Sequence, residues 1–435
     1  MLITSPSLQI TPINHPLDAA VRVPGSKSLT NRALLIAALA DGTTRLTNAL
    51  FSDDSKYFAN ALQTLGFEVQ SDELKQEITV TGLRGKIPSK KAELFIGNAG
   101  TAARFLSAFL TLGHGEFILD GDARMRERPI RDLIDALHQL GVELEASNNC
   151  PPVEIYAKGL PGGQTKIAGN ISSQFLSALL MVAPYANSPI EIDVTTELNS
   201  KPYVDMTIAI MKDFGVEIER HGYEHFTIRP SSFLPPFDAA QGKLSSYFIE
   251  SDASAASYFF AAPAICGGIV RVENISRNSK QGDIAFLDIL EQMGCEIKEA
   301  DNSVEVMRTK SLVGVDVDMR DIPDTAQTLA AIAPFATSPT RIRGIASARL
   351  KETDRVHGTC MELARLGIGV EEYEDGLTIY PCGDIQPGTI HTYNDHRMAM
   401  AFSLIGLRNP GIVIENPACV SKTFPNYFEV LDGLR

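Results

Sequence analysis

Cationic side chains stand where the sequence predicts the starts of apolar helices, a place that is electrostatically unfavourable for them. Lys27 and Arg32 open one such stretch, and His396 and Arg397 open another. The amino end of a helix carries unpaired N–H groups and a partial positive charge, which disfavours cations and attracts anions. A bound anion would offset the cations, so these positions predict anion-binding sites.

Six helix starts of this kind recur along the chain, all rich in small or polar residues. They begin near Ser28, Thr101, Ser173, Ser254, Thr325 and Asp395, at intervals of 70 to 81 residues. Each leads into an alanine-rich apolar stretch, whose nearly continuous hydrophobicity predicts a helix buried on most sides. Ser254 and Thr325 fit the simpler role of N-cap, which needs no ligand. Capping does not explain the cations at the other starts.

A second helix type recurs in phase with the first and ends at a glycine. These glycines are Gly66, Gly141, Gly215, Gly294 and Gly367, spaced by 75, 74, 79 and 73 residues, and short strands follow them. Glycine favours the position just past a helix end, because it adopts the left-handed conformation without strain. The period predicts six α/β units. The last copy is incomplete, so we expect the N-terminal segment to supply its strand and to pack with the C-terminal half.

Length and composition restrict the class of protein. A chain of 435 residues favours two domains, and 44% hydrophobic with 21% charged residues is typical of a globular protein. The formal net charge of −14 disfavours nucleic acid or an anionic membrane as a partner. Residues 1–16 contain no basic segment and no long apolar run, so we expect no secretory signal. Six scattered cysteines indicate reduced thiols in the cytoplasm.

Several motifs of cofactor and nucleophile sites are missing from the sequence. Residues 25–28 read Gly-Ser-Lys-Ser without the spacing of a P-loop, and residues 97–100 do not complete GxGxxG. Neither HExxH nor a His/Cys cluster is present, and GxSxG is missing as well. We therefore expect no metal and no cofactor.

Nine short motifs, in order along nearly the whole chain, resemble those of the enolpyruvyl transferases and specifically of the EPSP synthases. They are residues 24–28 (PGSKS), 97–102 (GNAGTA), 124–130 (RMRERPI), 172–181 (SSQFLSALLM), 200–203 (SKPY), 321–324 (DIPD), 350–355 (LKETDR), 393–400 (YNDHRMAM) and 421–425 (SKTFP). The resemblance implies an α/β fold of two domains, each a threefold inside-out barrel, in agreement with six repeat units. We expect residues 1–25 with 248–435 to form domain I and 26–247 domain II, with the active site in the cleft between them.

The resemblance implies transfer of the enolpyruvyl group of phosphoenolpyruvate to the 5-hydroxyl of shikimate 3-phosphate, with release of phosphate, in aromatic amino acid biosynthesis. The hydroxyl adds to the second carbon while the methylene takes a proton, and phosphate leaves from the tetrahedral intermediate. This chemistry needs a base and an acid. Asp324 is the candidate base, and Glu352 and Lys27 are candidates for the proton transfers at the methyl carbon. Asp324 as a plain N-cap and Glu352 as a salt-bridge partner of Arg355 remain alternatives.

The resemblance also assigns two sets of binding residues. For shikimate 3-phosphate they are Lys27, Ser28, Arg32, Ser172, Ser173, Gln174, Ser200, Tyr203, Asp324 and Lys351. For phosphoenolpyruvate they are Lys27, Gly100, Arg124, Gln174, Arg355, Arg397 and Lys422. His396, Asn98 and Ser347 are further candidates. Arginine side chains suit carboxylate and phosphate because they bind both oxygens at once, and the family suggests a monomer.

Two positions depart from the family pattern. Phe105 stands where the family often has proline, and Ser347 stands where an asparagine commonly meets the substrate. Gly100 is the small residue expected of enzymes that glyphosate inhibits, so we expect inhibition, which the bulk of Phe105 could weaken.

Two other functions are compatible with parts of the sequence. The first is enolpyruvyl transfer to UDP-N-acetylglucosamine, but that family usually has a reactive cysteine in the loop matching residues 124–129, and none is present here. The second is a non-catalytic repeat scaffold that binds an anion, which would have no need of the carboxylates of Asp324 and Glu352.

Overall fold

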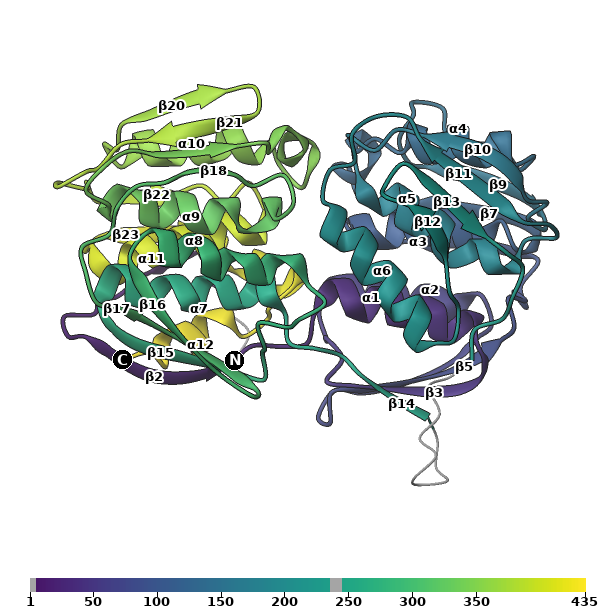
Figure 1. The fold of residues 1–435 in the computed structure, drawn as a ribbon, viewed down its shortest axis with the longest axis horizontal. Coiled ribbons are helices and arrows are strands. Elements are labelled where there is room, and N and C mark those ends of the chain that lie inside the picture. Colours follow the sequence, from purple (N-terminus) through teal and green to yellow (C-terminus); the bar gives the residue numbers. More distant parts are fainter. Residues whose placement is uncertain (1–4, 235–244) are drawn as a thin grey trace. The chain divides into compact units, whose positions relative to one another are not determined.

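The computed structural model describes residues 5–234 and 245–435, which form two compact α/β units (Figure 1). The central unit comprises residues 25–249, and the terminal unit comprises residues 1–24 with 250–435. The described strands form six sheets, three in each unit.

The three sheets of the central unit share one topology. In each, two parallel strands are extended on one side by two antiparallel strands. In spatial order the strands are β14 (Ser245–Phe248), β3 (Asp41–Thr47), β5 (Glu77–Leu83) and β4 (Glu68–Asp72); β6 (Lys91–Phe95), β7 (His114–Asp120), β9 (Val153–Lys158) and β8 (Glu143–Glu145); β10 (Gly163–Ile167), β11 (Ile190–Val194), β13 (His225–Ile228) and β12 (Glu219–His221).

The terminal unit repeats this topology twice in full and once in part. The full sheets are β2 (Leu17–Arg22), β15 (Gly268–Glu273), β17 (Ser303–Arg308) and β16 (Cys295–Ala300); β18 (Asp316–Asp318), β19 (Thr340–Arg343), β21 (Gly376–Ile379) and β20 (Val370–Tyr373). The third has β22 (Gly388–Ile390), β23 (Ile412–Glu415) and β1 (Ser7–Gln9). Strand β1 pairs antiparallel with β23, with Leu8 opposite Ile414. The expectation that the N-terminal segment completes the last repeat is therefore confirmed.

Two strands are exchanged between the repeats that open the units. Strand β2 comes before the first buried helix of the central unit, yet it pairs with β15 of the terminal unit. Strand β14 comes before the first buried helix of the terminal unit, yet it pairs with β3 of the central unit. The chain therefore passes from one unit to the other between a strand and the buried helix that follows it.

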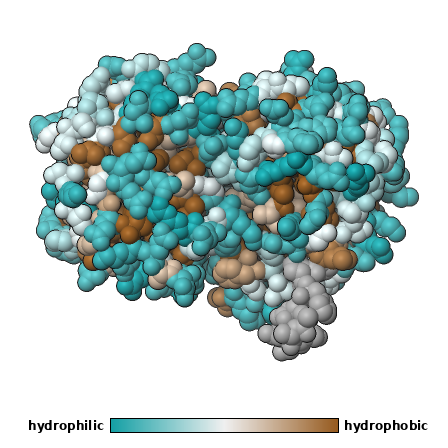
Figure 2. All heavy atoms as spheres, in the orientation of Figure 1, coloured by the Kyte–Doolittle hydropathy of each residue, from teal (hydrophilic) through white to brown (hydrophobic). Residues whose placement is uncertain are grey.

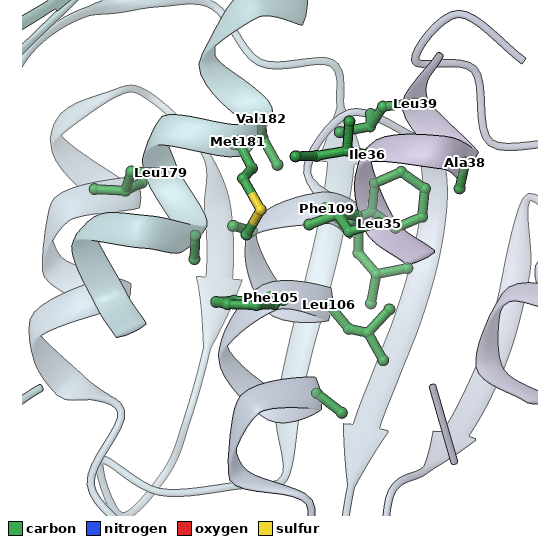
Figure 3. Close-up of a cluster of buried hydrophobic side chains, with 14 of the residues drawn as sticks. Leu35, Ile36, Ala38, Leu39, Phe105, Leu106, Phe109, Leu179, Met181 and Val182 are labelled. Carbon is green, nitrogen blue, oxygen red and sulfur yellow. The ribbon is translucent and has the colours of Figure 1, made fainter. Parts of the chain in front are cut away.

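One helix of each repeat is buried on almost every side, as the apolar stretches predict. These helices are α1 (Lys27–Leu39), α3 (Gly100–Leu110), α5 (Ser173–Val182), α7 (Ala253–Cys266), α9 (Ala326–Ile332) and α11 (His396–Arg408), each beginning within one residue of its predicted start. Figure 3 shows Leu35 of α1, Phe109 of α3 and Met181 of α5 within one apolar cluster. Small and branched apolar side chains let the buried helices pack closely.

Neither Ser254 nor Thr325 caps its helix through its side chain, although Thr325 does stand at the N-cap position of α9. Helix α7 is capped by Asp252, which accepts a hydrogen bond from the N–H of Ala255, and the Ser254 hydroxyl donates to Asp283 instead. The hydroxyl of Thr325 donates to the carbonyl of Ile322, so it leaves the first N–H groups of α9 to other partners.

The second helix of each repeat is amphipathic and ends as predicted. These helices are α2 (Asp53–Thr64), α4 (Arg131–Gln139), α6 (Lys201–Asp213), α8 (Phe286–Gln292), α10 (Arg355–Arg365) and the short α12 (Tyr427–Asp432). The five glycines after α2, α4, α6, α8 and α10 have φ of +93°, +81°, +83°, +104° and +76°. Only glycine adopts this conformation without strain, so the C′ role of the repeated glycines is confirmed.

On the face shown in Figure 2, hydrophilic residues cover most of the described surface, and hydrophobic residues form separate patches. Within residues 5–234 and 245–435, every helix is too short or too polar to cross a membrane.

Candidate active site

In the terminal unit, the predicted ligands converge on the buried guanidinium of Arg355, the first residue of α10. Its Nε donates to Oδ2 of Asp395 at 2.8 Å, Nη1 to Oδ1 of Asp324 at 3.1 Å, and Nη2 to Oε2 of Glu352 at 2.8 Å. Burial opposes the charge, but the carboxylates of Asp395, Glu352 and Asp324 outweigh this cost and raise the pKa of Arg355 above its ordinary value. This arginine is therefore firmly held and permanently charged.

Two further cations extend the cluster on either side of Arg355. Arg397 donates through Nη2 to Oδ2 of Asp324 at 2.7 Å and through Nη1 to the Asp324 carbonyl at 3.1 Å. Lys422 places Nζ 3.2 Å from Oε1 of Glu352. Cations and carboxylates thus alternate, and two of the candidate proton carriers, Asp324 and Glu352, each lie between two cations.

Local structure explains how the chain places these groups. Asp324 lies in a 3-10 turn (Pro323–Thr325) just before α9, and Lys422 ends another one (Pro417–Lys422). Asp395 caps α11 by accepting from the N–H of Arg397 at 2.9 Å, while it also binds Arg355. The carboxylates therefore offset cations that the helix dipoles disfavour, which corrects the inference that Arg397 at its helix start requires a bound anion.

The remaining candidates of the terminal unit flank this cluster. His396 is fully buried, with Nδ1 3.5 Å from Oδ1 of Asp395. Ser347 is buried in a 3-10 helix (Ala346–Leu350), and Lys351 follows that helix directly, next to Glu352 in the chain.

In the central unit, the buried guanidinium of Arg32 joins the starts of α1, α5 and α6. Nε donates to Oγ1 of Thr207 at 2.7 Å and Nη1 to the Ser28 carbonyl at 3.0 Å. Nη2 donates to the Tyr203 carbonyl at 3.1 Å and to Oγ of Ser177 at 3.4 Å.

No carboxylate hydrogen-bonds to Arg32 among the described residues; its acceptors there are neutral oxygens. Burial lowers the pKa of Arg32 to about 10, although the nearby Tyr203 opposes this effect. The inference of an anion beside helix-start cations thus stays strongest at Arg32, because a buried cation with neutral partners is stabilised by any anion that reaches it.

Other predicted ligands lie at the starts of neighbouring helices. Ser172 caps α5 by accepting from the N–H of Gln174 at 3.3 Å, and the Gln174 amide donates to Oγ1 of Thr101 at 3.4 Å. Ser173 is the buried first residue of α5. Ser200 stands at the N-cap of α6 with a left-handed φ of +57°.

Lys27, predicted to touch both substrates, opens α1. Its Nζ lies 3.9 Å from Oδ2 of Asp54, a buried carboxylate in the first turn of α2. This pair gives Lys27 an acidic partner within the protein, so its place at a helix start does not by itself require an anion.

The basic loop after β7, which contains Arg124, Arg126 and Arg128, contacts the residues just before α3. Arg128 donates through Nη1 to the carbonyl and to Oδ1 of Asn98, at 3.2 and 2.9 Å. A Cβ atom on Gly100 would lie 2.4 Å from Nη2 of Arg128, so only glycine fits without movement. Arg124, from the same loop, donates through Nη1 to Oε2 of Glu127 at 2.8 Å.

The predicted residues thus form two groups, one in each unit. Lys27, Ser28, Arg32, Asn98, Gly100, Arg124, Ser172, Ser173, Gln174, Ser200 and Tyr203 belong to the central unit, and Asp324, Ser347, Lys351, Glu352, Arg355, His396, Arg397 and Lys422 to the terminal unit. Sequence reasoning missed the residues that hold these groups in place: Asp54, Arg128, Ser177, Thr207 and Asp395. A signal existed for Asp395, which precedes a helix start, and for Arg128, the last arginine of the basic loop.

Comparison with known proteins identifies the family. The family described as EPSP synthase (3-phosphoshikimate 1-carboxyvinyltransferase) matches residues 12–431. The chain belongs to this family. It is therefore an enzyme, a transferase of the shikimate pathway. The rival acceptor UDP-N-acetylglucosamine is not favoured.

Relatives of this family cover nearly the whole chain. The 3-phosphoshikimate 1-carboxyvinyltransferase of Nostoc punctiforme is 50% identical over 424 residues, covering 97% of both chains. The protein of the same name from Sulfurovum is 49% identical over 431 residues, covering 98% of this chain and 99% of its own. A solved EPSP synthase from Acinetobacter baumannii superposes with a TM-score of 0.80 at 24% identity and covers 98% of this chain and 97% of its own. The mixed α/β fold of two domains is therefore that of EPSP synthases.

Proposed function

We propose that this chain transfers the enolpyruvyl group of phosphoenolpyruvate to the 5-hydroxyl of shikimate 3-phosphate and releases phosphate. Family membership supports the reaction. Among the residues, the position of Arg355 between Asp324 and Glu352 supports this reaction most directly. It places two carboxylates, which can transfer protons, beside a cation that suits an anionic substrate.

Phosphoenolpyruvate binds to Arg355, Arg397 and Lys422 in the terminal unit, together with Lys27, Gly100, Arg124 and Gln174 of the central unit. Arg397 donates to the Asp324 carboxylate at 2.7 Å, and Nζ of Lys422 lies 3.2 Å from the Glu352 carboxylate. Guanidinium groups can turn from a protein carboxylate to a ligand carboxylate or phosphate at little cost, because both accept the same paired hydrogen bonds.

Shikimate 3-phosphate binds chiefly in the central unit, to Lys27, Ser28, Arg32, Ser172, Ser173, Gln174, Ser200 and Tyr203, with Asp324 and Lys351 from the terminal unit. The support for this assignment is the buried Arg32, whose hydrogen bonds to neutral oxygens leave its charge uncompensated by an acid among the described residues. His396, Asn98 and Ser347 are further contacts in this proposal.

Asp324 acts as the base in the addition step. It takes the proton of the 5-hydroxyl as the oxygen bonds to the second carbon of phosphoenolpyruvate, and the methylene carbon gains a proton from Glu352 or Lys27. The methyl group then returns a proton to Glu352 or Lys27 as the C–O bond to phosphate breaks and phosphate leaves. Each oxygen of Asp324 accepts a hydrogen bond, one from Arg355 and one from Arg397, and keeps a second lone pair with which Asp324 can take the proton.

We extend the proposal to the architecture of the two units and to the oligomeric state and cellular location of the enzyme. The three sheets and three buried helices of each unit form an inside-out α/β barrel, and domains of residues 1–25 with 248–435 and 26–247 contribute their two groups of ligands to one active site. The enzyme is a cytoplasmic monomer that needs neither metal nor cofactor. Six cysteines without disulfide bonds support the cytoplasmic setting.

The deciding experiment is phosphate release by the purified protein, given phosphoenolpyruvate and shikimate 3-phosphate without metal or nucleotide. We expect release only when both substrates are present. Lack of release with shikimate 3-phosphate, while UDP-N-acetylglucosamine supports it, would replace the proposed acceptor.

A variant of the base separates catalysis from mere anion binding. We expect Asp324→Ala to lose about a hundredfold or more in kcat, the contribution of one general base, while calorimetry still detects shikimate 3-phosphate. Asp384→Ala, which removes an exposed aspartate, is the matched control and keeps wild-type kcat. If Asp324→Ala kept full activity, the base would have to be another group.

A further inference from the structure

We propose that Phe105 is a positioning residue for Arg32, and that the face of its ring holds the guanidinium in the orientation that receives an anionic group of shikimate 3-phosphate. This inference rests on the proposed function, because it deepens the role of Arg32 there. It assigns a site function to a residue that composition alone would place in the apolar core.

The geometry brings the two side chains together from different helices. Cζ of Arg32, on α1, lies 5.2 Å from the centroid of the Phe105 ring, on α3. Both residues are almost completely buried, with exposed fractions of 1% and 0%. A guanidinium over an aromatic face within about 6 Å is attracted by the negative charge of the ring face, and burial strengthens the attraction.

The ring of Phe105 adds a contact of a different kind to the hydrogen bonds of Arg32. Thr207, Ser28, Tyr203 and Ser177 accept from its N–H groups through neutral oxygens. The ring, 5.2 Å from Cζ, contributes negative charge density where no acid among the described residues hydrogen-bonds to Arg32. Because burial lowers the pKa of Arg32, each favourable contact with its charged form matters for keeping it charged and in place.

Phe109 offers a matched comparison on the same helix. Both rings belong to the apolar cluster of α1, α3 and α5 in Figure 3, and both are fully buried. The Phe109 ring packs against Phe67, with centroids 5.8 Å apart, rather than over a cation. If Phe105 were only a core residue, Phe105→Leu and Phe109→Leu would have the same effects.

The first test detects the contact without relying on activity. In protein labelled with ¹⁵N-arginine, the Nε–H resonance of Arg32 is identified as the one lost in Arg32→Lys. We expect Phe105→Leu to shift this resonance, since the ring current is removed, and Phe109→Leu to leave it close to wild type. Equal shifts in the two variants, or no shift in Phe105→Leu, would overturn the proposal.

The second test concerns function. We expect both variants to unfold at lower urea concentrations, but only Phe105→Leu to raise the KM for shikimate 3-phosphate, by about tenfold for one desolvated contact, with the KM for phosphoenolpyruvate unchanged. In an Arg32→Lys background, Phe105→Leu should add little. An equal rise in both variants would overturn the positioning role.

The two tests also distinguish this proposal from the proposed function. If the wild type neither binds nor converts shikimate 3-phosphate, the proposed function fails and the positioning role fails with it, even where the resonance shifts. If the wild type is active and Phe105→Leu keeps the wild-type KM, only the positioning role fails.

Discussion

The carboxylate of Asp395 accepts two hydrogen bonds from Arg355, from Nε at 2.8 Å and from Nη2 at 3.2 Å, and one of the same oxygens caps α11. The two side chains are 0% and 3% exposed. This contact ties the start of α10 to the start of α11. It therefore fixes the position of Arg355, to which Asp324 and Glu352 also bind.

Neutralising Asp395 should weaken both the fold and the site. Asparagine caps helices about as well as aspartate, so Asp395→Asn removes the charge while keeping the cap. We expect a loss of about 3 kcal/mol in the free energy of unfolding, the lower end for a broken buried ion pair, because two carboxylates remain beside Arg355. Urea unfolding measures the loss, and the KM for phosphoenolpyruvate should rise.

Asp354→Asn is the control for this change. Asp354 caps α10 and binds Arg349 at 2.8 Å, but its side chain is 39% exposed. We expect a loss of about 1 kcal/mol or less. Equal losses at the two positions would contradict the special role of the buried pair.

Adding a methyl group at Gly100 should displace Arg128. The new Cβ would lie 2.4 Å from Nη2, and the guanidinium is held by Asn98. We expect Gly100→Ala to cost about 1–3 kcal/mol of stability, as overpacking does, and to raise the KM for phosphoenolpyruvate. Gly383→Ala, where a Cβ would meet nothing within 4 Å, is the control. If Arg128→Ala did not reduce the cost of Gly100→Ala, the two residues would be uncoupled.

Glyphosate should inhibit phosphate release, because the chain has glycine at position 100 and the family resemblance assigns sensitivity to a small residue there. The measurement is the initial rate at increasing glyphosate, at fixed phosphoenolpyruvate. Full activity at millimolar glyphosate would show that Phe105, or another neighbour of Gly100, prevents binding.

Stability should fall in alkaline solution because of buried thiols. Burial raises the pKa of Cys266 and Cys295 to about 11, and that of Cys360 and Cys419 to about 12. Their neutral forms stabilise the fold below the thiol pKa of the unfolded chain, near 9. Above it the unfolded chain binds fewer protons than the folded one, so stability decreases until the pH passes the folded pKa.

The expected slope is up to about 1.4 kcal/mol per pH unit for each thiol. Urea midpoints at about pH 8 and about pH 10.5 measure it. Cys266→Ala should flatten the dependence, whereas Cys382→Ala, at a partly exposed thiol, serves as the control. An unchanged slope in Cys266→Ala would exclude this thiol as a source of the alkaline instability.

Several features of the fold could be predicted from the sequence because short-range interactions decide them. The glycines that end the amphipathic helices all have positive φ, as a C′ residue requires, since only nearby backbone determines that conformation. The starts of the buried helices were predicted within one residue, because the change from polar to apolar residues marks where burial begins. The pairing of the N-terminal strand with the last repeat is long-range, and it was predicted from a different signal, the incomplete last repeat.

The residue that caps a helix could not be predicted from the local sequence alone. Ser254 is of a residue type that caps helices and lies near the predicted helix start, yet Asp252 caps α7 and Ser254 donates to Asp283, 29 residues along the chain. The family resemblance assigned Arg355 and Arg397 to an anionic substrate, but the sequence did not reveal that Asp395 binds Arg355 and that Asp324 binds Arg397.

Only the tertiary structure decided which partners each buried charge has. Arg355 and Asp395 are 40 residues apart, and Arg32 and Thr207 are 175 apart. The cost of burying a charge is set by every group around it, and those groups come from several repeats of the chain. The sequence determined the repeats and the residue types at the helix starts, whereas packing of the repeats determined that Arg355 has three carboxylates and Arg32 has neutral oxygens and the ring of Phe105.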